Sequence, residues 1–162
     1  MSKTLDVIQN RYKFEYKPDE SLDYEVARDI YHFHFGYLIT SYNKYNFDER
    51  LKKLSDILKR KETKIREEEF IFYNNKINEF ITQTKNIREK FLDEYHNYSF
   101  LFYKFKMNYD ANQNVPEALD ICKNILKDLL NKISKSCINY EKEFLSIYDL
   151  IVDINNKLIN LY

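Results

Sequence analysis

The C-terminal part of the sequence repeats an apolar residue every three or four positions without interruption. Neither glycine nor proline breaks the repeat between Cys122 and Leu161. Such spacing places the apolar side chains on one face of an α-helix. The repeat positions are Cys122, Leu126, Leu129, Ile133, Cys137, Tyr140, Phe144, Ile147, Ile151, Ile154, Leu158 and Leu161. Since Pro116 suits the first turn of a helix, we expect one helix of about 45 residues, close to 70 Å long.

A helix of that length needs another helix along its apolar face. The stretch between Ile77 and Phe105 carries a second apolar stripe, so we expect an antiparallel, coiled-coil-like hairpin in the C-terminal half. The aromatic positions of this stripe, from Phe91 to Phe105, are expected to be packed core. We therefore predict an all-α fold, an elongated helical bundle in which residues 1–18 form a short arm and residues 19–162 a single domain.

The composition excludes several other classes of protein. The chain has one glycine, Gly36, and two prolines, which is too little turn chemistry for an all-β fold. Glycine-rich phosphate loops are excluded for the same reason. The 26 basic and 26 acidic residues balance, so no overall field draws the chain to nucleic acid or to anionic lipid.

The sequence also indicates a compartment. It shows no secretory signal and no apolar run of the length that a membrane span needs. Cys122 and Cys137 are 15 residues apart, which separates them by about 22 Å on one helix, too far for a disulfide between them. We expect reduced core cysteines and a cytoplasmic protein without membrane contact.

The N-terminal third carries the residues that we expect at an interface. Residues 12–16 alternate aromatic and charged side chains, which suits an extended arm, and Asp19 or Ser21 can cap a helix running from about Leu22 to Tyr45. That helix has two apolar stripes, one through Val26, Ile30, Phe33 and Tyr37 and one through Tyr31, Phe35, Leu38 and Tyr42. Two stripes indicate a helix covered on two sides. For contact with a partner we single out Tyr31, Phe35, Leu38, Tyr42, Tyr12 and Phe14.

The middle of the chain contains further helix boundaries. Asn46 and Glu49 form a capping-box pattern, so a helix should begin near Phe47. A five-residue step from Phe72 to Ile77 then breaks the apolar spacing, and we favour a turn at 73–75 over a stutter in one long helix. Residues 108–114 are expected to form a loop. Gly36, which costs helix stability, would be explained by a close helix crossing or by compositional drift.

Arg28 followed by His32 and His34 resembles the Arg-x4–6-His signature of HEPN-type ribonucleases. The resemblance covers seven residues, and the motif lies earlier in the chain than in that family. It implies a site shared by two protomers, in which His34 or His32 acts as general acid or base and Arg28 stabilises phosphate charge. The residues themselves also fit an ordinary helix surface, so this ribonuclease is the third hypothesis for function.

Two Asp-x-x-His spacings, Asp29 with His32 and Asp93 with His96, place a carboxylate and an imidazole on one helix face. Paired across a bundle they would suggest a di-metal site. Such sites also need inward-facing glutamates from two further helices, and none stands out here. We therefore predict no metal and no cofactor.

The stretch from Arg50 to Arg66 is strongly basic, and its lysines and arginines could contact phosphates. The positions that favour nucleic acid are Lys52, Lys53, Lys59, Arg60 and Lys64. Because these charges alternate with a regular apolar stripe, we favour a solvated helix face as their explanation. No catalytic motif is evident, so the first hypothesis is a non-enzymatic scaffold or regulator that binds protein, as a homodimer or larger homo-oligomer. Nucleic-acid binding is the alternative.

Overall fold

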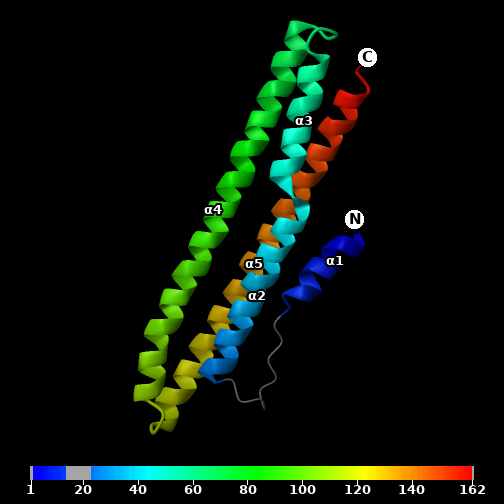
Figure 1. The fold of residues 1–162 in the computed structure, drawn as a ribbon. Helices are drawn as coiled ribbons and strands as arrows, with labels where there is room; N and C mark the ends of the chain where they lie inside the picture. Colours follow the sequence, from blue (N-terminus) through cyan, green and yellow to red (C-terminus); the bar gives the residue numbers. More distant parts are fainter. Residues whose placement is uncertain (1, 14–22, 162) are drawn as a thin grey trace. The chain divides into compact units, whose positions relative to one another are not determined.

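The computed structural model describes residues 2–13 and 23–161. Within these residues it contains five helices and no strand, which confirms the all-α prediction. The helices are α1 (Ser2–Arg11), α2 (Tyr24–Tyr45), α3 (Phe47–Lys61), α4 (Glu67–Ala111) and α5 (Pro116–Ile159) (Figure 1). None of them is both long and apolar enough to span a lipid bilayer.

By their internal packing the residues divide into two units. Unit 1 contains residues 1–40 and 91–142, and unit 2 contains residues 41–90 and 143–162. Helices α2, α4 and α5 each contribute one stretch to both units. The boundaries predicted from the sequence, an arm over 1–18 and a bundle over 19–162, stay a prediction. The short helix α1, which the sequence analysis did not expect, belongs to unit 1.

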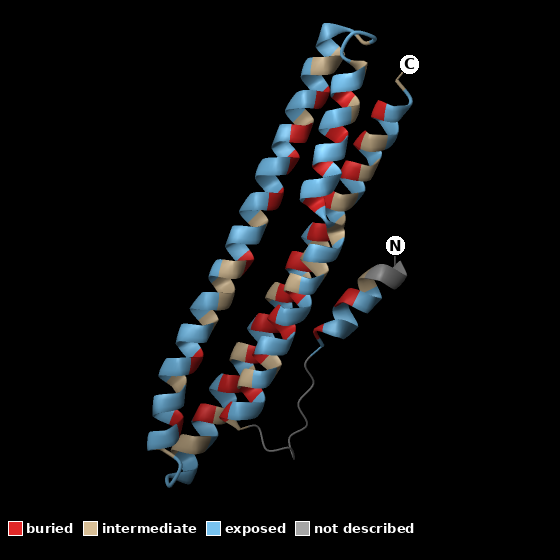
Figure 2. Cartoon of the chain, in the orientation of Figure 1, coloured by how far each residue is buried: buried red, intermediate tan, exposed pale blue. Residues whose placement is uncertain are grey.

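In unit 1, α4 and α5 run antiparallel on either side of a short connection (Figure 1). The core lies between their facing stripes and α2, where the rings of Tyr31 and Phe102 stack at 4.9 Å and those of Phe35 and Tyr95 at 5.0 Å. The hydroxyl of Tyr140 donates a 2.5 Å hydrogen bond to Glu94 across the helix pair. Buried residues fall on one side of each helix (Figure 2), which confirms the amphipathic spacing of α5. The expected position Leu129 is only half-buried, and Leu130 is buried instead.

The core of unit 2 is a layer of aliphatic and aromatic side chains from α3, α4 and α5. Its buried members include Phe47, Leu51, Leu54, Leu58, Tyr73, Ile77, Phe80, Phe144, Ile147, Ile151, Ile154 and Leu158. Lys61, the last residue of α3, donates hydrogen bonds to the carbonyls of Ile159 and Leu161 at the end of α5. These bonds satisfy carbonyls that have no partner within the helix.

Two helix boundaries differ from the sequence prediction. The chain does not turn at 73–75, because α3 ends at Lys61 and α4 continues from Glu67 to Ala111. The boundary between α3 and α4 is marked by a change of charge, since three basic residues end α3 and three glutamates begin α4. Basic residues suit the negative C-terminal end of a helix dipole, and acidic residues suit its positive N-terminal end. Glu69 also accepts a hydrogen bond from the Arg66 N–H, which is half of a capping box.

The ends of α2 and α4 also differ in detail. Helix α2 begins at Tyr24 and is capped by Asp23, whose side chain accepts the Val26 N–H at 2.8 Å; the predicted caps Asp19 and Ser21 lie outside the described residues. Helix α3 begins at Phe47 as predicted, but Asn46 makes no capping bond to a backbone N–H. The loop expected over 108–114 is shorter, because α4 reaches Ala111.

Candidate functional site

The aromatic stripe that we expected at an interface is buried inside unit 1. Tyr31, Phe35 and Leu38 have no exposed surface, and neither has Tyr12. Tyr42, in unit 2, is half-buried and donates a 3.1 Å hydrogen bond to the Thr84 carbonyl. In the folded single chain four of these side chains therefore pack inside and Tyr42 is partly accessible; their role at an interface stays a prediction. Phe14, the sixth predicted interface residue, lies outside the described residues.

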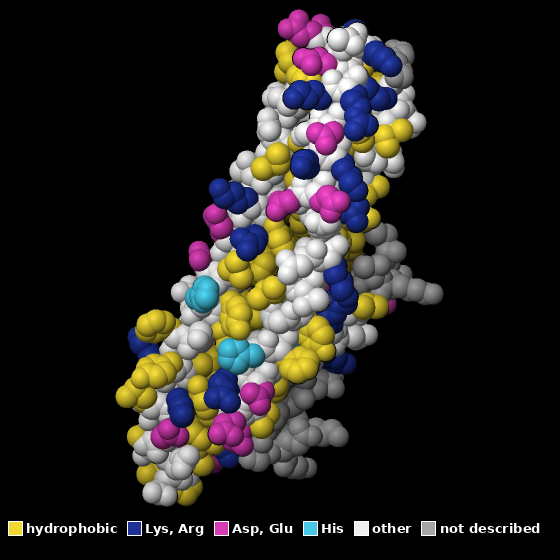
Figure 3. Space-filling model, in the orientation of Figure 1, with side chains coloured by type: hydrophobic (Ala, Val, Ile, Leu, Met, Phe, Trp, Pro, Cys, Tyr) yellow, Lys and Arg dark blue, Asp and Glu magenta, His cyan; other side chains and the backbone are white. Residues whose placement is uncertain are grey.

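The other apolar stripe of α2 is the exposed one. We call it the α2 face, and it comprises Val26, Ile30, Phe33, Gly36 and Tyr37. Phe33 is 63% exposed, and Val26 and Tyr37 are each 43% exposed. The residues recur at spacings of three and four, so they form one continuous strip along the helix. Hydrophobic side chains are visible among charged ones on the surface that carries α2 and α4 (Figure 3). Contiguous apolar surface of this kind marks protein-binding sites.

Gly36 forms a notch in the middle of the α2 face. A Cβ atom built on Gly36 would meet no atom within 4 Å, so no helix of the described chain crosses there, contrary to one explanation we considered. At Gly36 the surface has a shallow depression, which is lined by His32, Phe33, Gly36 and Tyr37. The rings of Phe33 and Tyr37 lie 5.1 Å apart on one side of it. The α2 face therefore combines a protruding ring with an adjacent hole.

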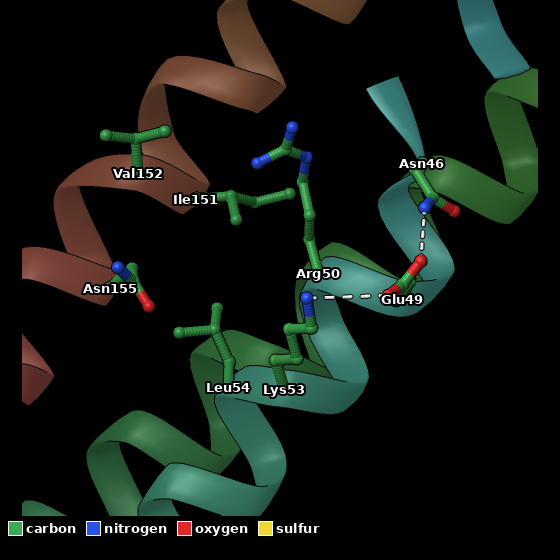
Figure 4. A pocket seen from close by; sticks show the side chains of 8 residues that line it. All are labelled: Asn46, Glu49, Arg50, Lys53, Leu54, Ile151, Val152 and Asn155. Atoms are coloured by element: carbon green, nitrogen blue, oxygen red, sulfur yellow. Dashed lines mark hydrogen bonds and ion pairs between the residues drawn. The ribbon is translucent and has the colours of Figure 1, made fainter. Parts of the chain in front are cut away.

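A second hollow lies between α3 and α5 in unit 2. We call it the α3–α5 groove; it has a volume of about 350 Å³ and is lined by Asn46, Glu49, Arg50, Lys53, Leu54, Ile151, Val152 and Asn155 (Figure 4). Its walls mix a buried apolar base with charged and amide side chains at the rim. A volume above 300 Å³ falls in the range of small-molecule sites.

No family model, curated protein or solved structure matches the chain. Any function must therefore be inferred from the chemistry of the sites themselves.

The two residues that resemble a ribonuclease signature are not brought together. Arg28 pairs with Asp29 at 3.7 Å and lies over the ring of Tyr24. His34 is only 6% exposed and points into the core of unit 1. Burial lowers its pKa from 6.5 to about 4, so the imidazole is neutral at pH 7 and the imidazolium form that would act as a general acid is scarce. This geometry does not favour Arg28 and His34 as a catalytic pair.

His34 instead belongs to a buried polar cluster that anchors α1. Its ring meets the Tyr12 ring edge to face at 5.6 Å, and the Ser134 hydroxyl donates to the Tyr12 carbonyl. Arg11 forms a 2.5 Å ion pair with Glu141, which is 1% exposed. Three buried polar atoms in this cluster have no hydrogen-bond partner among the residues that the structure describes: the Tyr12 hydroxyl, His34 Nδ1 and Glu141 Oε2. Glu141 was not predicted as part of a site because it occupies a position next to the apolar stripe of α5.

The two Asp-x-x-His spacings do not assemble into a larger group. The Nδ1 atom of His32 lies 3.0 Å from the Tyr95 hydroxyl, and the His96 ring stacks beside the same tyrosine at 5.9 Å. Among the described residues, no three His, Cys, Asp or Glu side chains are close enough together to hold a metal ion.

The basic residues of α3 and its C-terminal connection are on the surface. Lys52, Lys53, Lys59, Arg60 and Lys64 are all exposed. Lys53 pairs with Glu49 at 3.4 Å, one helical turn away. The apolar residues of α3 are buried on its opposite side, so the cations cover a solvated face of an amphipathic helix.

Proposed function

We propose that this protein acts without catalysis, as a scaffold or regulator that self-associates through the α2 face. The observation that carries the proposal is the exposure of Phe33 beside the open notch at Gly36. Burying exposed aromatic surface is the main favourable term in protein association. A glycine in a helix interior costs about 1 kcal/mol relative to alanine, and a close approach by another molecule offsets that cost.

A second copy of the chain is the partner that fits this surface. In a two-fold interface, residue i of one copy contacts residue j of the other, and j contacts i. If two α2 faces pair antiparallel, Phe33 of each copy lies over Gly36 of the other. The same contact then forms twice, and each protruding ring fills a hole. The face therefore carries both halves of a complementary contact.

Other exposed apolar residues lack this complementarity and supply a control. Phe100, Tyr103 and Met107 of α4 are exposed by 64% or more. They also follow a spacing of three and four, but the stripe contains no glycine. Exposure alone would predict association through α4 as readily as through α2.

Sedimentation equilibrium over a range of concentrations tests the proposal. We expect the wild-type chain to approach twice its 19.9 kDa mass, and Phe33→Glu to stay at the monomer mass, because the interface would bury an unpaired carboxylate. Phe100→Glu should associate like the wild type. A monomeric wild type, or dissociation by Phe100→Glu and not by Phe33→Glu, would refute self-association through α2.

Nucleic-acid binding through α3 is the alternative function. The exposed positions of Lys52, Lys53, Lys59, Arg60 and Lys64 favour it. Phosphate contacts release counterions, so affinity for a random-sequence RNA or DNA oligonucleotide should fall steeply from low to high salt. If no binding is measured at low salt, nucleic-acid binding is excluded. If binding is measured but replacing Lys59 and Arg60 with Gln leaves the affinity unchanged, α3 is not the surface that binds the nucleic acid.

A further inference from the structure

The α3–α5 groove contains one cationic side chain held in a fixed position. The Arg50 Nε–H donates a 2.6 Å hydrogen bond to the Tyr45 carbonyl, and the guanidinium lies 4.8 Å from the centroid of the Tyr148 ring. These two contacts leave the Nη atoms of Arg50 without an acceptor among the described residues. Figure 4 shows the side chain extending from α3 toward Ile151 of α5. A guanidinium fixed in this way loses little conformational freedom when it binds an anion.

The groove beneath Arg50 is apolar. Leu54 and Ile151 are buried, and Val152 is half-buried. Asn46 and Asn155 contribute amide groups at the two sides (Figure 4). A ligand that fits these walls needs an aliphatic body against the base and an anionic or polar end at the rim.

The charge of the rim favours a single carboxylate over a polyanion. Glu49 lies in the rim, where Asn46 donates a hydrogen bond to it at 2.5 Å and Lys53 pairs with it. These partners lower the pKa of Glu49, the Asn46 bond contributing most, so Glu49 is ionised at pH 7. It offsets the charge of Lys53 and repels dense negative charge such as a phosphate chain. Arg50 is also near enough to lower the pKa of Glu49, but among the described residues the carboxylate forms its ion pair with Lys53.

We propose that the α3–α5 groove binds a carboxylate carried on a short aliphatic chain, with the Nη atoms of Arg50 donating to both carboxylate oxygens. Paired donation of this kind matches the geometry of guanidinium and carboxylate. The aliphatic chain packs against the accessible part of Val152, above the floor that Leu54 and Ile151 close. The ligand can be a free carboxylic acid or the C-terminal carboxylate of a peptide that ends in leucine, since both present the same chemistry. The groove lies in unit 2, so this proposal does not depend on self-association through the α2 face.

Calorimetric titration of the full chain with hexanoate, hexylammonium and inorganic phosphate at pH 7 tests the ligand class, and methyl NMR of Leu54 and Ile151 locates the site. We expect hexanoate to bind and shift both methyl groups, and the other two probes not to bind. A leucine-terminated peptide with a free carboxylate, compared with the same peptide amidated, distinguishes the two sources. Binding by either source supports the proposal, and equal binding of the amidated peptide contradicts it.

Three variants separate recognition from folding. Arg50→Met should lower the affinity for hexanoate by at least about tenfold, which is what loss of a charge-assisted pair implies. Val152→Phe, which fills the groove from α5 and leaves Arg50 in place, should abolish binding. Lys59→Met, on the same helix outside the groove, should change nothing. The proposal is overturned if hexanoate does not bind, if phosphate or hexylammonium binds as tightly, or if both groove variants bind like the wild type.

Discussion

Phe33 and Gly36 lie one turn apart on the exposed side of α2, with the ring of Phe33 63% exposed beside a glycine that has open space above it. The two residues present a protrusion and a hole of opposite shape on one surface. This relationship is the basis for the self-association that we propose, because in two copies related by a two-fold axis the Phe33 ring of each copy can fill the hole at Gly36 of the other.

Gly36→Ala should stabilise the folded monomer. The added methyl group meets no atom within 4 Å, and alanine favours the helix by about 1 kcal/mol relative to glycine. The comparison is made between Phe33→Glu and the double variant Phe33→Glu with Gly36→Ala, because Phe33→Glu removes the effect of association. We expect the free energy of urea unfolding of the double variant to be higher by about 1 kcal/mol. A loss of stability would show that Gly36 is crowded in the folded chain.

Arg11→Met should destabilise the docking of α1. The substitution leaves the Glu141 carboxylate buried without its 2.5 Å partner, and an uncompensated buried charge costs several kcal/mol. Since part of the Arg11 side chain reaches solvent, we expect a loss of about 2 kcal/mol by chemical denaturation. Lys157→Met breaks the exposed pair with Asp153 and should cost less than about 0.5 kcal/mol. Equal losses would contradict the assignment of Glu141 to a buried cluster.

His34 should make the protein less stable in acid. Its pKa is lowered from 6.5 to about 4 in the folded chain, so below pH 6.5 the unfolded chain binds a proton that the folded chain does not. The His34 contribution is complete above pH 6.5, is lost as the pH falls toward 4, and amounts to at most about 3 kcal/mol. His34→Phe keeps an aromatic contact with Tyr12 and should lose less stability than wild type between pH 7.5 and 4.5. Identical losses in the two proteins would show that His34 does not titrate in this way.

Cys137 should resist alkylation in the native protein. It has no exposed surface and no disulfide, and its pKa is raised by burial and then by the charges of Glu94 and Glu141. Because the thiolate is the reactive form, iodoacetamide should modify Cys137 far more slowly in the folded chain than in urea, as measured by peptide mass spectrometry. Similar rates in both conditions would place the thiol at the surface.

The sequence was sufficient to predict α5, because one apolar stripe separates its two sides clearly. It was not sufficient for α2, where two stripes are similarly apolar. The stripe through Tyr31 and Phe35 is buried because its rings meet Tyr95 and Phe102 of α4, and the Tyr31 hydroxyl donates to the Tyr95 carbonyl. Which of the two apolar stripes of α2 is buried depends on the residues of the helix that packs against it, and the spacing within α2 does not identify that helix.

The break in the middle of the chain was misplaced for a simpler reason. Counting Phe72 as a core position created an apparent shift of phase, whereas Phe72 is exposed and Tyr73 is buried. From Tyr73 through Ile77, Phe80 and Thr84 the spacing is regular. The charge reversal from the end of α3 to Glu67–Glu69 was the signal that could have located the boundary.

The role of Arg50 in the α3–α5 groove and the burial of Glu141 were not predictable from the spacing of residues in the sequence alone. Arg50 is distinguished from the other basic residues of α3 only by its contacts with Tyr45 and Tyr148. Glu141 is distinguished by an ion pair to a residue 130 positions away in the chain. Both depend on tertiary contacts.

A mixing experiment tests self-association through the α2 face most directly. Phe33→Ala removes the protrusion and Gly36→Phe fills the hole, so each variant alone should remain a monomer by light scattering. Mixed in equal amounts, they should form a heterodimer, because the ring introduced at position 36 of one chain can occupy the space left at position 33 of the other. A mixture that stays monomeric while the wild type dimerises would contradict the pairing of Phe33 with Gly36.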